Sequence, residues 1–202
     1  MKKLIFSLDA LSKKIVEISI LFAFVFLLIP SIVFARERWI LDKELSSITF
    51  ELPVLLAKNV QGTFNSFEGF VEIDVEHKEN NKAIFSVDIG SIDMNYKKYK
   101  NLLLSNIFFD EKQFPKAAID TKKFAYQNEK ELEIYVELII KGQSQMIPLS
   151  IMVKRLAEEL VQIQSELVFS RTDFNIGIGN WSNTTILRDK IKIKTNLFLF
   201  KE

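Results

Sequence analysis

Residues 190–199, KIKIKTNLFL, decide the fold class, because apolar and polar side chains alternate along them. One face carries Ile191, Ile193, Leu197 and Leu199, and the other carries Lys190, Lys192, Lys194 and Asn196. A period of two is the pattern of a β-strand with one buried face and one solvated face. The stretch therefore predicts a strand of an antiparallel sheet.

The same alternation recurs upstream, with turn residues between the runs. The apolar faces are Ile48, Phe50 and Leu52; Val71, Ile73 and Val75; Phe85, Val87 and Ile89; Leu132, Ile134, Val136 and Leu138; Ile147, Leu149, Ile151 and Val153; and Val161, Ile163, Leu167 and Phe169. Some seven or eight such strands favour a closed barrel, which leaves no sheet edge exposed. The exception is residues 96–109, YKKYKNLLLSNIFF, which lack this period and predict a short helix around residues 96–107.

The N-terminal segment, residues 1–35, differs from the rest of the chain. Lys2, Lys3, Lys13 and Lys14 precede an uncharged apolar run, residues 18–35, that contains Pro30 and ends in Ala35. A basic segment, an apolar run and a small terminal residue are typical of a secretory signal peptide. We therefore expect cleavage after Ala35 and a single domain at residues 36–202. Because the run approaches the length that spans a bilayer, a retained membrane anchor is the alternative.

The composition excludes several classes of protein and site. The 202 residues include no cysteine and one histidine, His77, which falls in a polar turn. Disulfide, thiolate–zinc and iron–sulfur sites are therefore excluded, and a catalytic triad would depend on one exposed imidazole. A formal net charge of +1 with 48% hydrophobic residues suits neither a nucleic-acid-binding nor a disordered chain. Since no Walker loop, dinucleotide fingerprint or nucleophile elbow is present, we expect neither an enzyme nor a resident cofactor or metal.

Six groups of short motifs follow one another between Trp39 and Leu199. They are Trp39-x-x-Asp42 with Ser47-Ile48-Thr49-Phe50; Val60-x-Gly62-x-Phe64-x-x-Phe67-x-Gly69; Ile89-Gly90-Ser91-Ile92; Leu104-Ser105-x-x-Phe108-Phe109-Asp110 with Phe114-Pro115; Leu138-x-x-x-Gly142 with Pro148-Leu149; and Ser170-Arg171-Thr172-Asp173-Phe174-x-Ile176-Gly177. In this order they resemble the YceI-like family, the polyisoprenoid-binding, lipocalin-like periplasmic proteins. The resemblance covers essentially the whole chain after the leader.

The resemblance implies an all-β fold, a lipocalin-like antiparallel eight-stranded β-barrel whose interior holds an isoprenoid lipid such as a polyprenyl chain or a quinone. The residues expected to bind that lipid are Phe50, Phe64, Phe67, Phe85, Leu103, Phe108, Phe109, Phe169, Arg171 and Phe174. It also implies a bacterial periplasmic protein that sequesters or transports the lipid and touches a membrane only transiently, unless the leader is retained. No nucleic-acid partner is expected, and the oligomeric state is left open, a homodimer included.

Several alternatives stay open at this point. The phenylalanines could pack a solid core instead of lining a cavity, and the apolar segment 102–109 could be a fixed cap or a lid. Arg171 and Asp173 share a face by period two, where Arg171 either anchors the loop containing Gly177 or meets a lipid head group. The row of lysines at residues 190–194 and the row of glutamates at residues 131–137 are expected on solvated outer faces. Two rival functions are an enzyme that positions an isoprenoid substrate against Arg171 or Asp173, and an anchored envelope protein with a solid core.

Overall fold

The computed structural model describes residues 36–52 and 60–202, and ten β-strands in these ranges form one continuous sheet. The strands are β1 (Arg36–Leu52), β2 (Val60–Phe64), β3 (Phe67–Asp74), β4 (Lys82–Asp88), β5 (Ile92–Met94), β6 (Lys116–Asp120), β7 (Glu131–Ile140), β8 (Gln143–Ala157), β9 (Leu160–Ser170) and β10 (Lys190–Lys201). The predicted leader, residues 1–35, lies outside the described residues. No helix in the described ranges is long and apolar enough to cross a membrane.

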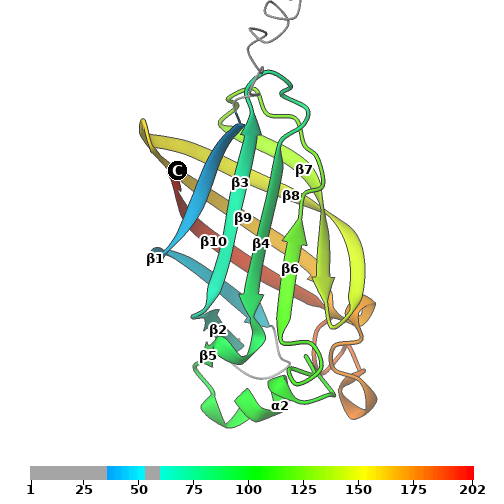
Figure 1. The fold of residues 1–202 in the computed structure, drawn as a ribbon. Helices are drawn as coiled ribbons and strands as arrows, with labels where there is room; N and C mark the ends of the chain where they lie inside the picture. Colours follow the sequence, from blue (N-terminus) through cyan, green and yellow to red (C-terminus); the bar gives the residue numbers. More distant parts are fainter. Residues whose placement is uncertain (1–35, 53–59) are drawn as a thin grey trace, which may run out of the picture. The chain divides into compact units, whose positions relative to one another are not determined.

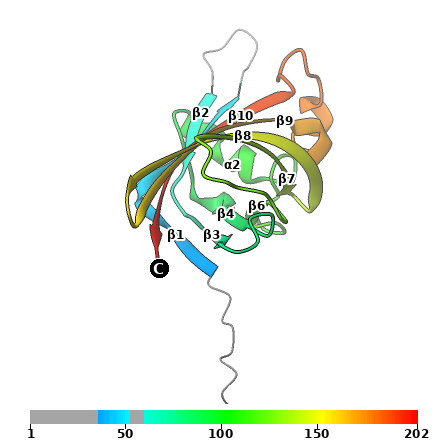
Figure 2. The same ribbon diagram turned by 90° about the horizontal axis from the view of Figure 1, so that it is seen from above.

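Eight of these strands close into a barrel (Figure 1). Their order is β1-β3-β4-β6-β7-β8-β9-β10, and all neighbours are antiparallel. The ring closes because β10 pairs with β1 from Trp39 opposite Lys201 to Glu51 opposite Lys192. Seen from above, the strands form a ring with α2 within its outline (Figure 2). The predicted eight-stranded antiparallel barrel is thus confirmed.

Strands β2 and β5 extend the sheet beside the barrel. The first half of β1 pairs with β3, whereas its second half, Ile48–Leu52, pairs with β2. Strand β5 then pairs with β2. Between the two halves of β1 the register with β10 shifts, and the Asp42 carboxylate accepts hydrogen bonds from the backbone N–H groups of Glu44 and Leu45. This irregularity lets one long strand serve two neighbours.

In the part of the chain that the structure describes, helical structure is limited to short segments. They are the 3₁₀ helices η1 (Ile89–Ser91), η2 (Lys97–Tyr99), η3 (Arg171–Phe174) and η4 (Gly179–Trp181), and the α-helix α2 (Lys100–Leu104). The helix predicted around residues 96–107 is therefore present but shorter. It ends where Ser105 adopts an extended backbone and its hydroxyl donates to the Leu102 carbonyl at 2.6 Å.

The apolar run at residues 71–75 stops being a strand one residue before its predicted end. Val75 lies beyond β3 and is 52% exposed, whereas the Asp74 side chain is buried. The Asp74 carboxylate accepts hydrogen bonds from the backbone N–H groups of Glu76 and His77, at 3.2 and 2.9 Å. This turn reverses the chain toward β4, so the inward position predicted for Val75 is wrong.

Candidate functional site

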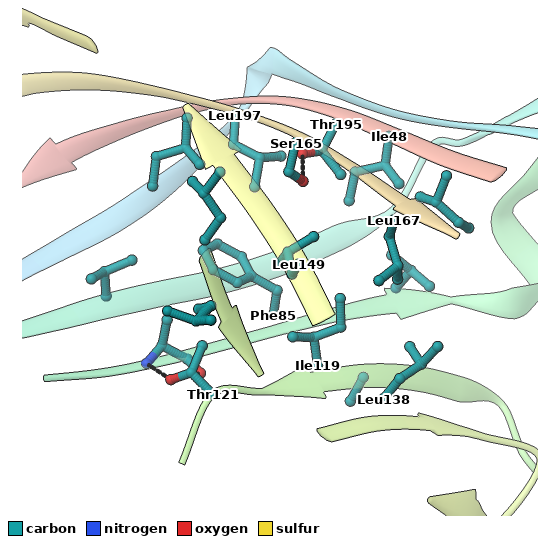
Figure 3. A pocket seen from close by; sticks show the side chains of 18 of the residues that line it. Ile48, Phe85, Ile119, Thr121, Leu138, Leu149, Ser165, Leu167, Thr195 and Leu197 are labelled. Atoms are coloured by element: carbon teal, nitrogen blue, oxygen red, sulfur yellow. Dashed lines mark hydrogen bonds between the residues drawn. The ribbon is translucent and has the colours of Figure 1, made fainter. Parts of the chain in front are cut away.

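The barrel encloses a cavity of about 880 Å³ that is lined by residues from all eight barrel strands. Its wall is formed by the inward members of the period-two runs, several of which are visible in Figure 3: Ile48, Phe85, Ile119, Leu138, Leu149, Leu167 and Leu197. A volume of this size lies at the upper end of the range for small-molecule sites. The aromatic side chains therefore line the barrel instead of filling it, which argues against a solid core.

Most of the residues predicted to bind a ligand lie on this cavity. Those that line it are Phe50, Phe64, Phe85, Leu103, Phe108, Phe109, Phe169 and Arg171. Phe67 and Phe174 are buried but lie outside the lining. Phe174 instead packs edge-on against Phe169, with ring centroids 5.3 Å apart, so it supports the wall from behind. Contact between any of these side chains and a ligand stays a prediction.

Two inward glycines allow aromatic rings to lie against the barrel wall. Gly62 on β2 is paired with Phe50 on β1, and Gly69 on β3 is paired with Phe85 on β4. A Cβ atom at Gly62 would lie 2.4 Å from the Phe50 ring, and one at Gly69 would lie 2.1 Å from the Phe85 ring. Both distances are far below van der Waals contact, so each ring occupies the space of the missing side chain. The glycines of the second motif thereby leave room in the lumen.

Helix α2 and the segment after it close one end of the barrel. Leu103 and Phe108 are 5% and 3% exposed, and Phe108 packs against Trp181 with ring centroids 5.7 Å apart. The Ile107 carbonyl accepts a hydrogen bond from the Gly177 N–H at 2.9 Å, which joins this segment to the loop after η3. These contacts favour the fixed-cap interpretation over the lid.

Arg171 anchors the same loop from within. The side chain is fully buried, and its guanidinium donates four hydrogen bonds to backbone carbonyls. Nη1 donates to Ile176 and Gly177 at 2.7 and 3.1 Å, Nη2 to Leu187 at 2.8 Å, and Nε to Arg188 at 3.2 Å. Burial lowers the pKa of this guanidinium from its ordinary value. Because four acceptors already occupy it, the loop-anchor interpretation is favoured over head-group recognition.

The expectation that Asp173 shares a face with Arg171 is wrong. Residues Arg171–Phe174 form the 3₁₀ helix η3, so the period of two ends at Ser170. Asp173 is exposed, whereas Asp189 is the acid next to Arg171 in the fold. Although burial opposes ionisation of Asp189, hydrogen bonds from the Thr172 hydroxyl and N–H, at 2.8 and 3.1 Å, hold its pKa below the ordinary value.

The opposite end of the cavity carries charged side chains. Strand β8 begins next to the closed end, since Lys141 just before it donates to the carbonyls of Asn106 and Asn175 at 2.7 and 2.9 Å. At its other end, Arg155 lies over the Trp39 ring, 5.9 Å from the centroid. The charged residues that line the cavity at this end are Glu37, Glu129, Lys130, Glu131, Lys154 and Arg155. An apolar lumen with a charged rim suits a largely apolar ligand.

Sequence reasoning missed two polar residues inside the barrel, Ser165 on β9 and Thr195 on β10. Both line the cavity, and their hydroxyl oxygens lie 2.8 Å apart across the paired strands. The signal was present in the alternation, because the apolar face of each run skips one inward position and these skipped positions are 165 and 195. Only the strand register shows that the two gaps meet.

The polar outer features lie where the sequence predicts them. Lys192 on the outer face of β10 forms an ion pair with Glu166 at 2.8 Å, and Glu133 on β7 is exposed. His77 lies in the turn between β3 and β4, where its side chain is 48% exposed and Nδ1 lies 3.4 Å from the Asp74 carboxylate. Within residues 36–52 and 60–202, no group of three or more potential metal ligands lies together.

Curated relatives match part of the chain. A UPF0312 protein of Staphylococcus aureus (strain N315) is 30% identical over 97 residues, which cover 48% of this chain and 54% of that protein. A UPF0312 protein of Staphylococcus epidermidis (SERP2314) is 29% identical over 103 residues, which cover 51% and 57% respectively. The chain thus spans about half the length of the curated relatives it matches.

Solved structures share the fold over most of their length. BcnA of Burkholderia cenocepacia aligns with a TM-score of 0.71 and 23% identity, over 78% of this chain and 98% of that one. A polyisoprenoid binding domain of Saccharophagus degradans aligns with a TM-score of 0.66 and 16% identity, over 81% and 98%. The YCEI protein of Campylobacter jejuni aligns with a TM-score of 0.64 and 22% identity, over 74% and 89%.

The family model of the YceI-like domain matches residues 39–199. This span runs from the buried Trp39 of β1 to the inward Leu199 of β10, so it includes residues of every strand of the closed barrel. The motifs that carried the resemblance lie within it, and they include the two glycines beneath the aromatic rings and the Arg171 anchor. The chain therefore belongs to the YceI-like family.

Proposed function

We infer that this protein binds an isoprenoid-type lipid, a polyprenyl chain or a quinone, in the barrel cavity and sequesters or carries it unaltered. The observation that carries this inference is the apolar cavity of about 880 Å³ enclosed by all eight barrel strands. Each buried CH₂ group of a lipid contributes roughly 0.8 kcal/mol, from which the entropy of association must be subtracted. The fold shared with a polyisoprenoid binding domain supports this ligand class.

The site of action in this proposal is the bacterial periplasm. It is supported by the leader pattern of residues 1–35, which predicts export and cleavage after Ala35. The intact mass of the exported protein tests this step, because the mature chain is expected to begin at Arg36. A mass that corresponds to a chain beginning at Met1 would contradict cleavage and indicate a retained anchor.

The decisive experiment is organic extraction and mass spectrometry of the full chain purified from the envelope of its native host. The expected result is a stoichiometric isoprenoid lipid recovered unaltered. Ile151→Trp, on the cavity wall, is expected to abolish recovery, whereas Ser150→Trp, on the outer face of the same strand, leaves it unchanged. An empty wild-type protein would contradict binding, and a chemically altered lipid would support an enzyme instead.

A further inference from the structure

The hydroxyl pair of Ser165 and Thr195 has hydrogen-bonding capacity left over. Their oxygens lie 2.8 Å apart, and either hydroxyl can be the donor. Two hydroxyl groups carry two protons, and their mutual hydrogen bond uses one of them. Among the described residues, neither hydroxyl makes a further hydrogen bond. The pair can therefore offer one O–H group and free lone pairs to a molecule in the lumen.

The pair lies within an otherwise apolar belt of the wall. Strand register places Ile48, Thr195, Ser165, Ile151 and Leu132 in one row of cross-strand neighbours along β1, β10, β9, β8 and β7. All five side chains line the cavity, and Figure 3 shows the pair joined across the lumen wall near Ile48. A lipid that fills the barrel must pass this belt, so the pair will meet the ligand and not bulk water.

On β9 the hydroxyl pair lies at half depth. Along β9, Val161 pairs with Arg155 near the charged rim, and Phe169 packs on Phe174 at the closed end. Ser165 is four positions from each, which corresponds to roughly 13 Å of strand in either direction. A ligand group held here is therefore well inside the barrel, where a charged group would lose its hydration without a counter-charge.

Three other polar groups on the wall, away from the charged rim, already have hydrogen-bond partners. The Thr121 hydroxyl accepts from the Ala83 N–H at 2.8 Å and lies 3.3 Å from the Ala83 carbonyl. The Ser86 hydroxyl donates to Glu68 at 3.3 Å, and Arg171 donates to four carbonyls. Compared with these groups, the pair is the better candidate to orient a ligand.

We propose that Ser165 and Thr195 form a specificity-determining subsite for a neutral oxygen, a ring carbonyl or a hydroxyl, of the bound lipid. The barrel then prefers a prenyl quinone or prenol over the bare hydrocarbon. It disfavours a prenyl phosphate, because no unoccupied cation of the described wall lies at this depth. A site built to hydrogen-bond a polar group discriminates against the analogue that lacks it. This subsite rests on the proposed function, since it concerns the same cavity.

The test compares two probes, a benzoquinone with a four-unit prenyl tail and the hydrocarbon of that tail, on the wild-type protein and on Ser165→Ala/Thr195→Val. The double variant is expected to lose roughly tenfold in affinity for the quinone, as for a lost hydrogen bond, and little for the hydrocarbon. Thr63→Val removes a hydroxyl from β2, outside the cavity lining, and should change neither affinity.

The outcomes separate the subsite from the proposed function. Unchanged quinone affinity, or an equal loss for both probes, overturns the subsite and leaves lipid binding intact. Failure of the wild-type protein to bind either probe overturns the proposed function itself. Should the double variant not fold, the carbonyl stretch of carbon-labelled quinone in the wild-type protein decides. A shift to lower frequency supports the hydrogen bond, and an unshifted band overturns it.

Discussion

At Gly69 the missing side chain determines how much of the lumen is open. Phe85 lies over this position, and its nearest ring carbon would be 2.1 Å from an added Cβ. Any side chain here must move the ring, and because Phe85 lines the cavity, a displaced ring changes the shape of the lumen. An added Cβ would also lie 2.8 Å from the Ile84 carbonyl oxygen, so a side chain here disturbs the β4 backbone as well as the lumen.

Gly69→Ala is expected to destabilise the protein by about 1–3 kcal/mol through overpacking and to weaken binding of the prenyl quinone. Phe85→Leu in the same chain should restore part of the affinity, because the smaller side chain makes room for the new methyl group. Calorimetric titration measures the affinity of the single and of the double variant. Gly90→Ala, whose Cβ would meet only the flexible Glu111 side chain at 3.3 Å, is the control. Equal losses of affinity in Gly69→Ala and Gly90→Ala would contradict the inference that Gly69 keeps the lumen open.

The Asp74 carboxylate predicts a dependence of stability on pH. Its hydrogen bond from the His77 N–H, which outweighs burial, lowers its pKa in the folded protein. A carboxylate whose pKa is lowered by folding stabilises the protein at pH values above its pKa in the unfolded state, about 3.9. This contribution is lost as the pH falls through the pKa of the folded state. The difference in unfolding free energy between wild type and Asp74→Asn should thus shrink below about pH 4. Urea titrations at several pH values check this, with the exposed Glu133→Gln as the comparison variant.

At the residue scale, inward apolar positions could be predicted from alternation, but side-chain partners could not. Phe50 and Phe85 were placed inward by period two, whereas the loss of that period at Arg171 depends on a 3₁₀ turn with no sequence marker. Ser165 and Thr195 interrupt two apolar faces, and their meeting depends on the β9–β10 register. Register is a tertiary property, so a single run cannot reveal it.

At the scale of elements, strands were predictable and their ends were not. Alternation identifies the body of β3, but the strand ends where Asp74 hydrogen-bonds the turn. The segment after Tyr96 was predicted as helical, and α2 extends over only Lys100–Leu104 because the chain then turns to cap the barrel. Local propensity sets the type of an element, and packing against the barrel end sets its length.

The loop between η3 and β10 depends on one buried side chain. Arg171→Met would leave four backbone carbonyls without their donor, so we expect a loss of about 3–5 kcal/mol in unfolding free energy. The affinity of the folded fraction for the prenyl quinone should change little, since the guanidinium serves the loop. Denaturant unfolding and probe titration measure the two effects. The exposed neighbour Arg188→Met is the control, and lost affinity without lost stability would indicate a head-group contact after all.

At the scale of the whole molecule, a ligand that fills the lumen joins all eight strands. At a free concentration of one hundred times Kd, it should stabilise the fold by about 2.7 kcal/mol. For a domain of this size that corresponds to a rise in Tm of about 5–10 °C. Differential scanning calorimetry with prenyl quinone, against matched detergent alone, measures the shift. Ile151→Trp should show none, and an equal shift in that variant would place the binding outside the cavity.

Because β1 pairs with β10, the barrel cannot close until β10 has been synthesised. Its partners, such as Glu51 and Lys192, lie more than 140 positions apart in the sequence. Until β10 has emerged, β1 and β9 each present an open edge, and no lumen exists to hold a lipid. Such long-range pairing slows folding. A nascent chain of this design therefore has no closed barrel, and no enclosed cavity, before β10 has been synthesised.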